Sequence, residues 1–171
     1  FMLRLRMVEE AIVSEYHPAD EMKCPVHFCI GQEAVSGVLN RILNPDDYLF
    51  SHHRSHGYYL AKGCSLTGLI CELYGKITGS NKGLAGSQDI SSSENNFYAG
   101  AILTGSLGIS IGAAYSKKYN QDKSIVVCCF GEGAADQGLF WEAINYASLK
   151  KLPILFICVN NIYATYSHIN K

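Results

Sequence analysis

Residues 125–138 read IVVCCFGEGAADQG, and residues 154–163 read ILFICVNNIY. Each stretch opens with a short apolar run that is followed by glycine or asparagine, a pattern typical of a buried strand. Between the two runs, apolar residues recur at helical spacing over 138–150. A strand, a helix and a second strand in this order predict two parallel strands whose carboxyl ends share one edge of a sheet.

Similar patterns predict the elements around this unit. Helices are expected at the start of the chain, over 31–43, after an N-capping Ser65 and over 105–118, with a weaker strand at 48–50. We therefore predict one α/β domain over 1–171, a parallel sheet with helices on both faces. Gly105, Gly108 and Gly112 lie along one side of a helix, which predicts close approach of another backbone. The polar stretch 78–96 predicts a functional or mobile loop.

Composition narrows the class of protein. Of the 171 residues, 48% are hydrophobic and 17% are charged, which is ordinary for a globular domain and outside the disordered range. The 14 basic and 15 acidic residues are scattered, so neither a nucleic-acid footprint nor a membrane-surface patch is indicated. The longest apolar run, at 152–159, is too short to span a bilayer.

The ends of the sequence and its cysteines give two further expectations. No capping residue precedes the first helix and the chain stops just after its richest motif, so we expect a piece of a protein that continues beyond both ends. No secretory leader or other targeting signal is visible, which favours a bacterial-type cytoplasm or an organelle reached by other means. The seven cysteines show no metal-ligand spacing, and we expect them to be reduced and buried.

The edge formed by the two predicted strands has the chemistry of a metal–phosphate site. Glu132 and Asn161 follow the two strands, and carboxylate, amide and carbonyl oxygens suit Mg²⁺ or Ca²⁺. Gly131 and Gly133 allow a phosphate to approach the backbone, and the helix that follows offers its N-terminal N–H groups to the same anion. Taken alone, Gly-Glu-Gly and Asn-Asn are also compatible with ordinary turns.

Further motifs give the pattern a family resemblance. The Gly131-Glu-Gly to Asn160-Asn161 pattern resembles the thiamine diphosphate signature. The chain as a whole resembles the α subunit of the decarboxylating component of 2-oxo acid dehydrogenases, of the pyruvate, branched-chain and acetoin types. The motifs that carry this resemblance are His27-x-x-x-Gly31-Gln-Glu-Ala34, Arg54-Ser-His56-Gly57, Lys82-Gly-Leu-Ala-Gly86-Ser87, Asn96-Phe-Tyr98, Gln137-Gly138, Glu142-Ala143, Leu152-Pro153 and Asn161-x-Tyr163-Ala164.

The resemblance implies a role for each matched residue. It implies Mg²⁺ ligands at Glu132, Asn161 and the Tyr163 carbonyl, where most relatives have Asp at the first of these positions. It implies that Arg54 and the backbone N–H groups of Gly133 and Ala134 meet the diphosphate, and that His53, Gly131 and Asn161 also contact the cofactor. It implies a substrate-channel histidine at His27, and backbone contacts to the aminopyrimidine ring around Ile102 to Thr104.

The resemblance also implies an activity shared with other chains. The expected reaction is oxidative decarboxylation of a small 2-oxo acid, or cleavage of acetoin, with acyl transfer to a lipoyl carrier on a separate acyltransferase. A β subunit would complete an α2β2 assembly and supply the glutamate that activates the cofactor, so this chain alone would be inactive. No nucleic-acid or membrane partner is expected.

Several departures leave two other hypotheses open. His53 stands where relatives usually have tyrosine, and Gln88-Asp89 stands where pyruvate-type relatives have Met-His. The sequence of residues 104–108 is closer to that of transketolases than to that of the usual α subunits. These differences concern the substrate more than the cofactor. The alternatives are a transketolase-like or divergent thiamine diphosphate enzyme, and a non-catalytic nucleotide-binding α/β module. No G-x-G-x-x-G loop follows a strand, which argues against a dinucleotide site.

Overall fold

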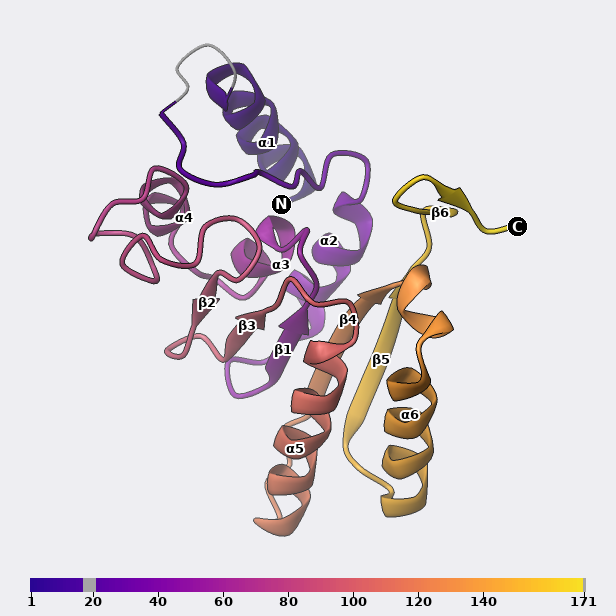
Figure 1. Ribbon diagram of the computed structural model, residues 1–171. Helices are drawn as coiled ribbons and strands as arrows, with labels where there is room; N and C mark the ends of the chain where they lie inside the picture. The colour runs from indigo at the N-terminus through magenta and orange to yellow at the C-terminus, as the bar shows by residue number, and fades with distance from the viewer. Residues whose placement is uncertain (17–20, 171) are drawn as a thin grey trace.

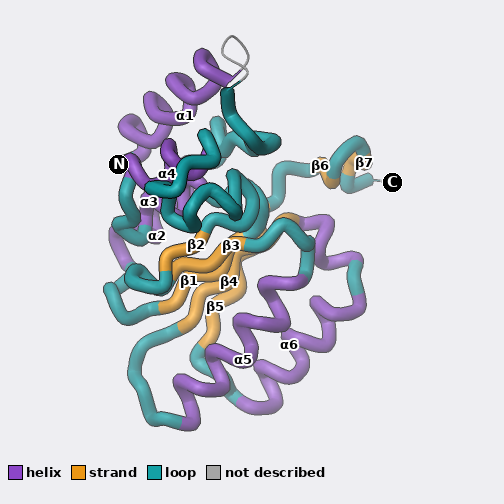
Figure 2. The backbone as a smooth tube through the Cα atoms, turned by 60° about the vertical axis from the view of Figure 1, so that its left-hand side comes forward, coloured by secondary structure: helices purple, strands orange, loops and turns teal. Residues whose placement is uncertain are grey.

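A computed structural model describes residues 1–16 and 21–170 as a sheet covered by helices on both faces (Figures 1 and 2). Its helices are α1 (Met2–Tyr16), α2 (Glu33–Ile42), α3 (His56–Ala61), α4 (Leu66–Leu73), α5 (Gly105–Tyr119), the 3₁₀ helix η1 (Glu132–Asp136) and α6 (Gly138–Lys150). Its strands are β1 (Tyr48–Ser51), β2 (Ser91–Ser92), β3 (Phe97–Ala99), β4 (Val126–Gly131), β5 (Ile154–Val159), β6 (Tyr163–Ala164) and β7 (Ser167–His168).

Five strands form the main sheet in the order β2-β3-β1-β4-β5. β4 pairs in parallel with β1 on one side and with β5 on the other, β1 pairs in parallel with β3, and only β2 is antiparallel. β5 is adjacent to β4, and Gly131 lies opposite Val159 at the end of the pair. The prediction of a parallel unit whose carboxyl ends meet is therefore confirmed.

Alternation along β4 divides the apolar core in two. Val127 and Cys129 belong to a cluster with residues of α1 to α4, whereas Val126, Cys128 and Phe130 belong to a cluster with α5 and α6. The ribbon shows the same arrangement, with α5 and α6 side by side on one face and α1 to α4 gathered beyond the other (Figures 1 and 2). Because both faces are covered, the five residues from Val126 to Phe130 are all buried.

Several local predictions are confirmed and one is wrong. Ser65 caps α4, its Oγ accepting a hydrogen bond from the Gly68 N–H at 3.1 Å. The weak strand at 48–50 is central in the sheet. The glycine stripe of α5 does not bring another backbone close: among the described residues, a Cβ at Gly108 would meet only the Leu139 side chain at 3.9 Å, and a Cβ at Gly112 would meet nothing within 4 Å.

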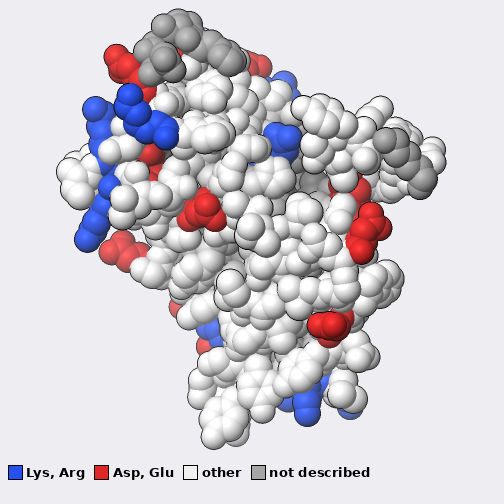
Figure 3. Space-filling model, in the orientation of Figure 1, with Lys and Arg blue, Asp and Glu red and all other residues white. Residues whose placement is uncertain are grey.

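The surface charge and the cysteines can be compared with the sequence, and the expectation of buried cysteines holds for four of the seven. On the face seen in Figure 3, acidic side chains are scattered, while several basic ones gather along its upper left. No helix within the described ranges is long and apolar enough to cross a membrane. All seven cysteines are free; four are buried, while Cys24 and Cys71 are half-buried and Cys158 is exposed.

A buried carboxylate organises the polar stretch that follows α4. Glu72 is 1% exposed, and its two oxygens accept four backbone N–H groups, from Asn81, Gly83, Ala85 and Gly86, at 2.7 to 3.2 Å. Burial opposes the charge, but these four donors outweigh it and hold the pKa of the Glu72 carboxyl below its ordinary value. The stretch is thus anchored along residues 81–86, through one side chain of the preceding helix.

We expect Glu72→Gln to lower the free energy of unfolding by about 2–3 kcal/mol at pH 7, because an amide cannot accept four N–H groups. A lowered carboxyl pKa contributes stability above its unfolded value of 4.5 that is lost as the pH falls through the folded value, so the difference from the parent should shrink below pH 4.5. Denaturant unfolding of the full chain at pH 7 and pH 4 measures both effects. Glu94→Gln, an exposed change in the same stretch, is the control. Equal stability of the two variants at pH 7 would contradict this role.

Candidate functional site

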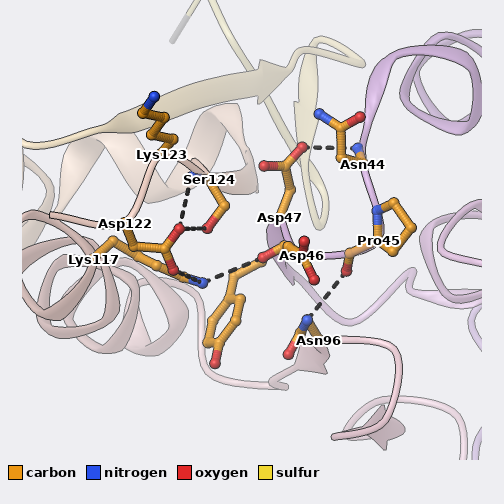
Figure 4. A pocket seen from close by; sticks show the side chains of 10 residues that line it. Asn44, Pro45, Asp46, Asp47, Asn96, Lys117, Asp122, Lys123 and Ser124 are labelled. Carbon is orange, nitrogen blue, oxygen red and sulfur yellow. Dashed lines mark hydrogen bonds and ion pairs between the residues drawn. The ribbon is translucent and has the colours of Figure 1, made fainter. Parts of the chain in front are cut away.

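Two hollows lie at opposite ends of the sheet. The larger, about 680 Å³, lies where β1 and β4 begin and is drawn in Figure 4. Its polar groups bind one another: Asp47 accepts backbone N–H groups from Asn44 and Ile125 at 2.8 and 2.9 Å, and Lys117 pairs with Asp122 at 2.8 Å. These contacts join the loop before β1 to the loop before β4, so this hollow is explained as a structural junction.

The second hollow, about 270 Å³, lies at the carboxyl ends of β4 and β5, the edge where open α/β sheets bind ligands. It is lined by His27, Gln32, His52, His53, Arg54, Leu103, Gly131, Glu132, Gly133, Val159, Asn161, Tyr163, Ala164 and Thr165. It brings together most of the residues predicted from the sequence to form the site, although they come from the first and the last thirds of the chain.

Glu132 is the residue whose surroundings are incomplete. Its Oε1 is buried and has no hydrogen-bond partner among the described residues, while its Oε2 accepts the Asn161 N–H at 3.4 Å. The Asn161 Oδ1 accepts the Tyr163 N–H at 3.0 Å, which folds the chain back after β5. A buried carboxylate oxygen without a donor costs free energy, and a cation would remove that cost. The donor set of carboxylate, amide and carbonyl oxygens fits Mg²⁺.

The two glycines of the motif have different roles. A Cβ at Gly131 would meet nothing within 4 Å, which leaves this backbone open to the hollow. A Cβ at Gly133 would lie 2.8 Å from the Ala164 Cβ, so the packing of the 160s loop already requires glycine there. The Ala134 side chain is fully buried in the core, which leaves only its backbone for a ligand.

The helix N-terminus beside Glu132 is not the one that was predicted to face the anion. The helix that begins next to Glu132 is the short 3₁₀ helix η1, and α6 starts only at Gly138. Gln137 adopts an extended backbone between them and breaks the helical run. The α-helical dipole of α6 therefore begins six residues beyond Glu132, and any N–H groups offered to an anion come from η1.

The other wall of the hollow is made of three histidines and an arginine. The rings of His27 and His53 pack edge to face with their centroids 5.1 Å apart, and the rings of His52 and His53 do so with centroids 5.5 Å apart. The Arg54 Nη1 donates to the Phe28 carbonyl at 2.8 Å. Burial lowers the pKa of all three histidines, and the positive charge of Arg54 lowers each further. Near neutral pH this wall therefore carries one fixed positive charge beside neutral imidazoles.

His52 is the most perturbed of the three histidines. It is 8% exposed, and burial, followed by the neighbouring His53 and Arg54, lowers its pKa to about 3. Its Nδ1 accepts the Arg54 N–H at 3.2 Å, so the neutral ring carries its proton on Nε2. That Nε2–H is buried and has no acceptor within the described ranges. Among the described residues, two buried polar atoms of residues that line the hollow thus have no partner, the His52 Nε2 donor and the Glu132 Oε1 acceptor.

Comparison with known proteins shows the family to which the chain belongs. Residues 1–169 match the family described as dehydrogenase E1 component. The chain belongs to the dehydrogenase E1 component family. It is 38% identical over 163 residues to the α subunit of acetoin:2,6-dichlorophenolindophenol oxidoreductase from Bacillus subtilis, covering 95% of this chain and 49% of that protein.

Two pyruvate dehydrogenase relatives and one solved structure are also similar to this E1-family chain. The α subunits from Dictyostelium discoideum (mitochondrial) and Rhizobium meliloti are 39% and 36% identical, covering 80% and 85% of this chain and 36% and 42% of theirs. The chain thus spans about half or less of the relatives it matches. A Mycobacterium smegmatis structure assigned as a thiamin diphosphate-dependent enzyme shares the fold, with a TM-score of 0.50 and 18% identity over 77% of this chain and 20% of its own.

The predicted ring-binding segment of the E1-family chain lies differently from the rest of the site. Leu103 lines the hollow, whereas Ile102 is 74% exposed and lines a separate surface depression. Thr104 is buried and its hydroxyl donates to the Gln137 Oε1 at 2.7 Å. Backbone contact to a ring at 102–104 stays a prediction, since the structure places only the middle residue of the segment at the hollow.

Sequence reasoning missed His52 and underused Gln88. The Gln88 side-chain amide lies 3.1 Å from the His27 Nδ1, so it contacts the ring predicted to face substrate. Gln88 had a signal, since it departs from the family pattern beside a recognised motif. His52 had only the run His52-His53-Arg54, in which the strand register decides which ring is buried.

We expect Arg54→Gln to raise the pKa of His27 and of His53, because the substitution removes a cation that disfavours their protonated forms. Histidine-selective NMR titration of the full chain measures these pKa values. Arg41→Gln, an exposed arginine at the end of α2, is the matched control and should leave both values unchanged. Unchanged histidine pKa values in Arg54→Gln would contradict the electrostatic description of this wall.

Proposed function

We propose that this chain is the α-subunit part of a thiamine diphosphate-dependent dehydrogenase that acts on a small 2-oxo acid or on acetoin. The observation that carries the proposal is the buried Glu132 Oε1 at the carboxyl edge of β4 and β5, which has no hydrogen-bond partner in the described part of the chain. Family membership supports the class of enzyme, and the similarity to an acetoin oxidoreductase and to pyruvate dehydrogenases supports the class of substrate.

The hollow suits a diphosphate bound through Mg²⁺. Glu132, Asn161 and the Tyr163 carbonyl would hold the metal, and Gly131 leaves the backbone beside it open. On the opposite wall the Arg54 guanidinium and the His52 Nε2–H are donors suited to phosphate oxygens. Without a metal, Glu132 would repel a diphosphate, so the account requires the cation as well as the anion.

His27 is the residue of this chain proposed to face the reacting substrate. Its ring lines the same hollow as Glu132 and Arg54, and burial keeps its pKa below the ordinary value. It is therefore neutral near pH 7 and can accept or donate a proton at a substrate oxygen. Thiamine diphosphate, when bound beside His27, would supply nucleophilic and electron-accepting chemistry for cleavage of a bond next to a carbonyl group.

The remaining parts of the enzyme are proposed to lie on other chains. Leu103 at the rim of the hollow is 45% exposed and Ile102 beside it is 74% exposed, which suits contact with a second subunit. We propose a β subunit in an α2β2 assembly there and a lipoyl-bearing acyltransferase as acyl acceptor. The domain over 1–171 would then be one part of a longer α subunit, working in a bacterial-type cytoplasm or an organelle.

Titration calorimetry on the full α subunit with its partner tests the proposal. Thiamine diphosphate should bind with Mg²⁺ and much more weakly without it, and Glu132→Gln should weaken metal-dependent binding at least about tenfold, as loss of a charged contact implies. Asp136→Asn removes the same charge from an exposed position on η1 and should leave binding unchanged.

Two outcomes would overturn the proposal or its substrate class. Equal binding with and without Mg²⁺, or indifference to Glu132→Gln, would remove the assigned site. Metal-dependent cofactor binding without reduction of a lipoyl carrier, in the presence of 2-oxo acids or acetoin, would favour the transketolase-like alternative instead.

A further inference from the structure

Four residues distant in sequence form a buried hydrogen-bonded chain behind the hollow. The Glu9 Oε1 lies 2.7 Å from the His56 Nδ1, and the His56 Nε2 lies 2.8 Å from the Ser87 Oγ. The Ser87 Oγ in turn accepts the His27 N–H at 3.1 Å. Glu9, His56 and Ser87 are each no more than 1% exposed. α1, α3 and the stretch after α4 thus each contribute one member to a chain that ends on the backbone of His27.

The connectivity matches that of an acid–histidine–serine catalytic triad, but the surroundings exclude a nucleophile. Ser87 is 1% exposed, so a substrate cannot reach its Oγ, and that oxygen already accepts the His27 N–H. Both imidazole nitrogens of His56 have a partner, the Glu9 carboxylate at Nδ1 and the Ser87 hydroxyl at Nε2. The chain is therefore a fixed support.

The backbone groups of three consecutive residues, 27–29, are bound by side chains of this buried chain and of Arg54. The His27 N–H is bound by Ser87, the Phe28 carbonyl by Arg54 at 2.8 Å, and the Cys29 N–H by the Glu9 Oε2 at 2.7 Å. Glu9 thus holds the segment directly with one oxygen and indirectly, through His56 and Ser87, with the other. No helix or strand includes these residues, so these side chains take the place of a regular backbone ladder.

The same stretch after α4 also contacts the imidazole of His27. Ser87 binds the His27 backbone, and the next residue, Gln88, places its amide 3.1 Å from the His27 Nδ1. The backbone and the ring of His27 are therefore held by two consecutive residues, Ser87 and Gln88. A shift of Ser87 would move the ring relative to Arg54 on the same wall and to Glu132 on the opposite wall of the hollow.

We propose that Glu9, His56 and Ser87 are a positioning relay that fixes the His27 imidazole in the cofactor hollow. What His27 faces there rests on the proposed function, but the relay itself rests only on the contacts above. None of the three relay residues lines the hollow. They act through His27, and their loss changes where its ring lies.

The test is the reactivity of the His27 ring in the full α subunit without cofactor. Diethyl pyrocarbonate acylates accessible neutral imidazoles, and mass spectrometry gives the rate at each histidine. Ser87→Ala should raise the rate at His27 at least about fivefold, the factor that corresponds to one hydrogen bond of about 1 kcal/mol. Ser110→Ala removes an equally buried hydroxyl, bonded to the Leu107 carbonyl within α5, and should leave the His27 rate unchanged.

A second variant keeps the test decisive if Ser87→Ala does not fold. His56→Asn retains an N–H for Glu9 but cannot reach Ser87, and it should raise the His27 rate in the same direction. In the assembled enzyme both relay variants should lower kcat more than they raise KM. An unchanged His27 rate in both variants, or an equal rise in Ser110→Ala, would overturn the relay. Cofactor binding is measured separately, so failure of the proposed function would leave this result standing.

Discussion

The parallel pairing of β4 with β5 determines where the chemistry of this chain can lie. Because Gly131 is opposite Val159, the residues that follow the two strands leave the sheet at the same edge and height. Glu132 and Asn161 meet there, 29 residues apart in sequence, with the Asn161 N–H 3.4 Å from a Glu132 oxygen. β4 can hold this position because both of its faces are buried and both of its edges are paired.

The first half of the chain completes the site from the opposite side. β1 pairs with β4 on the edge away from β5, so the residues after β1, His52 to Arg54, reach the same end of the sheet. The two walls differ in charge and in what they lack. One has a carboxylate oxygen without a donor, and the other has a cation and a histidine N–H without an acceptor. A metal-bound anion placed between them would satisfy both walls at once.

The sequence predicted the parts of this arrangement that depend on local pattern. Apolar runs followed by glycine or asparagine predicted β4 and β5, and helical spacing between them predicted α6. The order of these elements predicted that Glu132 and Asn161 would meet. The family resemblance added His27, His53 and Arg54, which the structure places in the same hollow, while their roles stay predictions. Ile102 and Thr104 were less well placed, because only Leu103 between them reaches the hollow.

Other features depended on contacts that one sequence does not reveal. Glu9 and Glu72 lie in predicted helices with no sign of a special role, and His56 was known only as part of a family motif. Each of the three is buried and binds groups far away along the chain. The glycines of α5 suggested a close backbone that is absent among the described residues. Burial of a charge is decided by the loops that fold around it, and periodicity carries no information about those partners.

Glu132 and Asn161 are proposed to form a metal–diphosphate site. Anomalous diffraction from crystals of the full α subunit and its partner, grown with Mn²⁺ and thiamine diphosphate, locates the metal directly. The account predicts a single strong peak at coordination distance, about 2.1 Å, from Glu132 and Asn161 oxygens, with diphosphate oxygens on its other side. A cofactor bound with its metal on other residues, or a hollow that stays empty while the cofactor binds elsewhere, would contradict it.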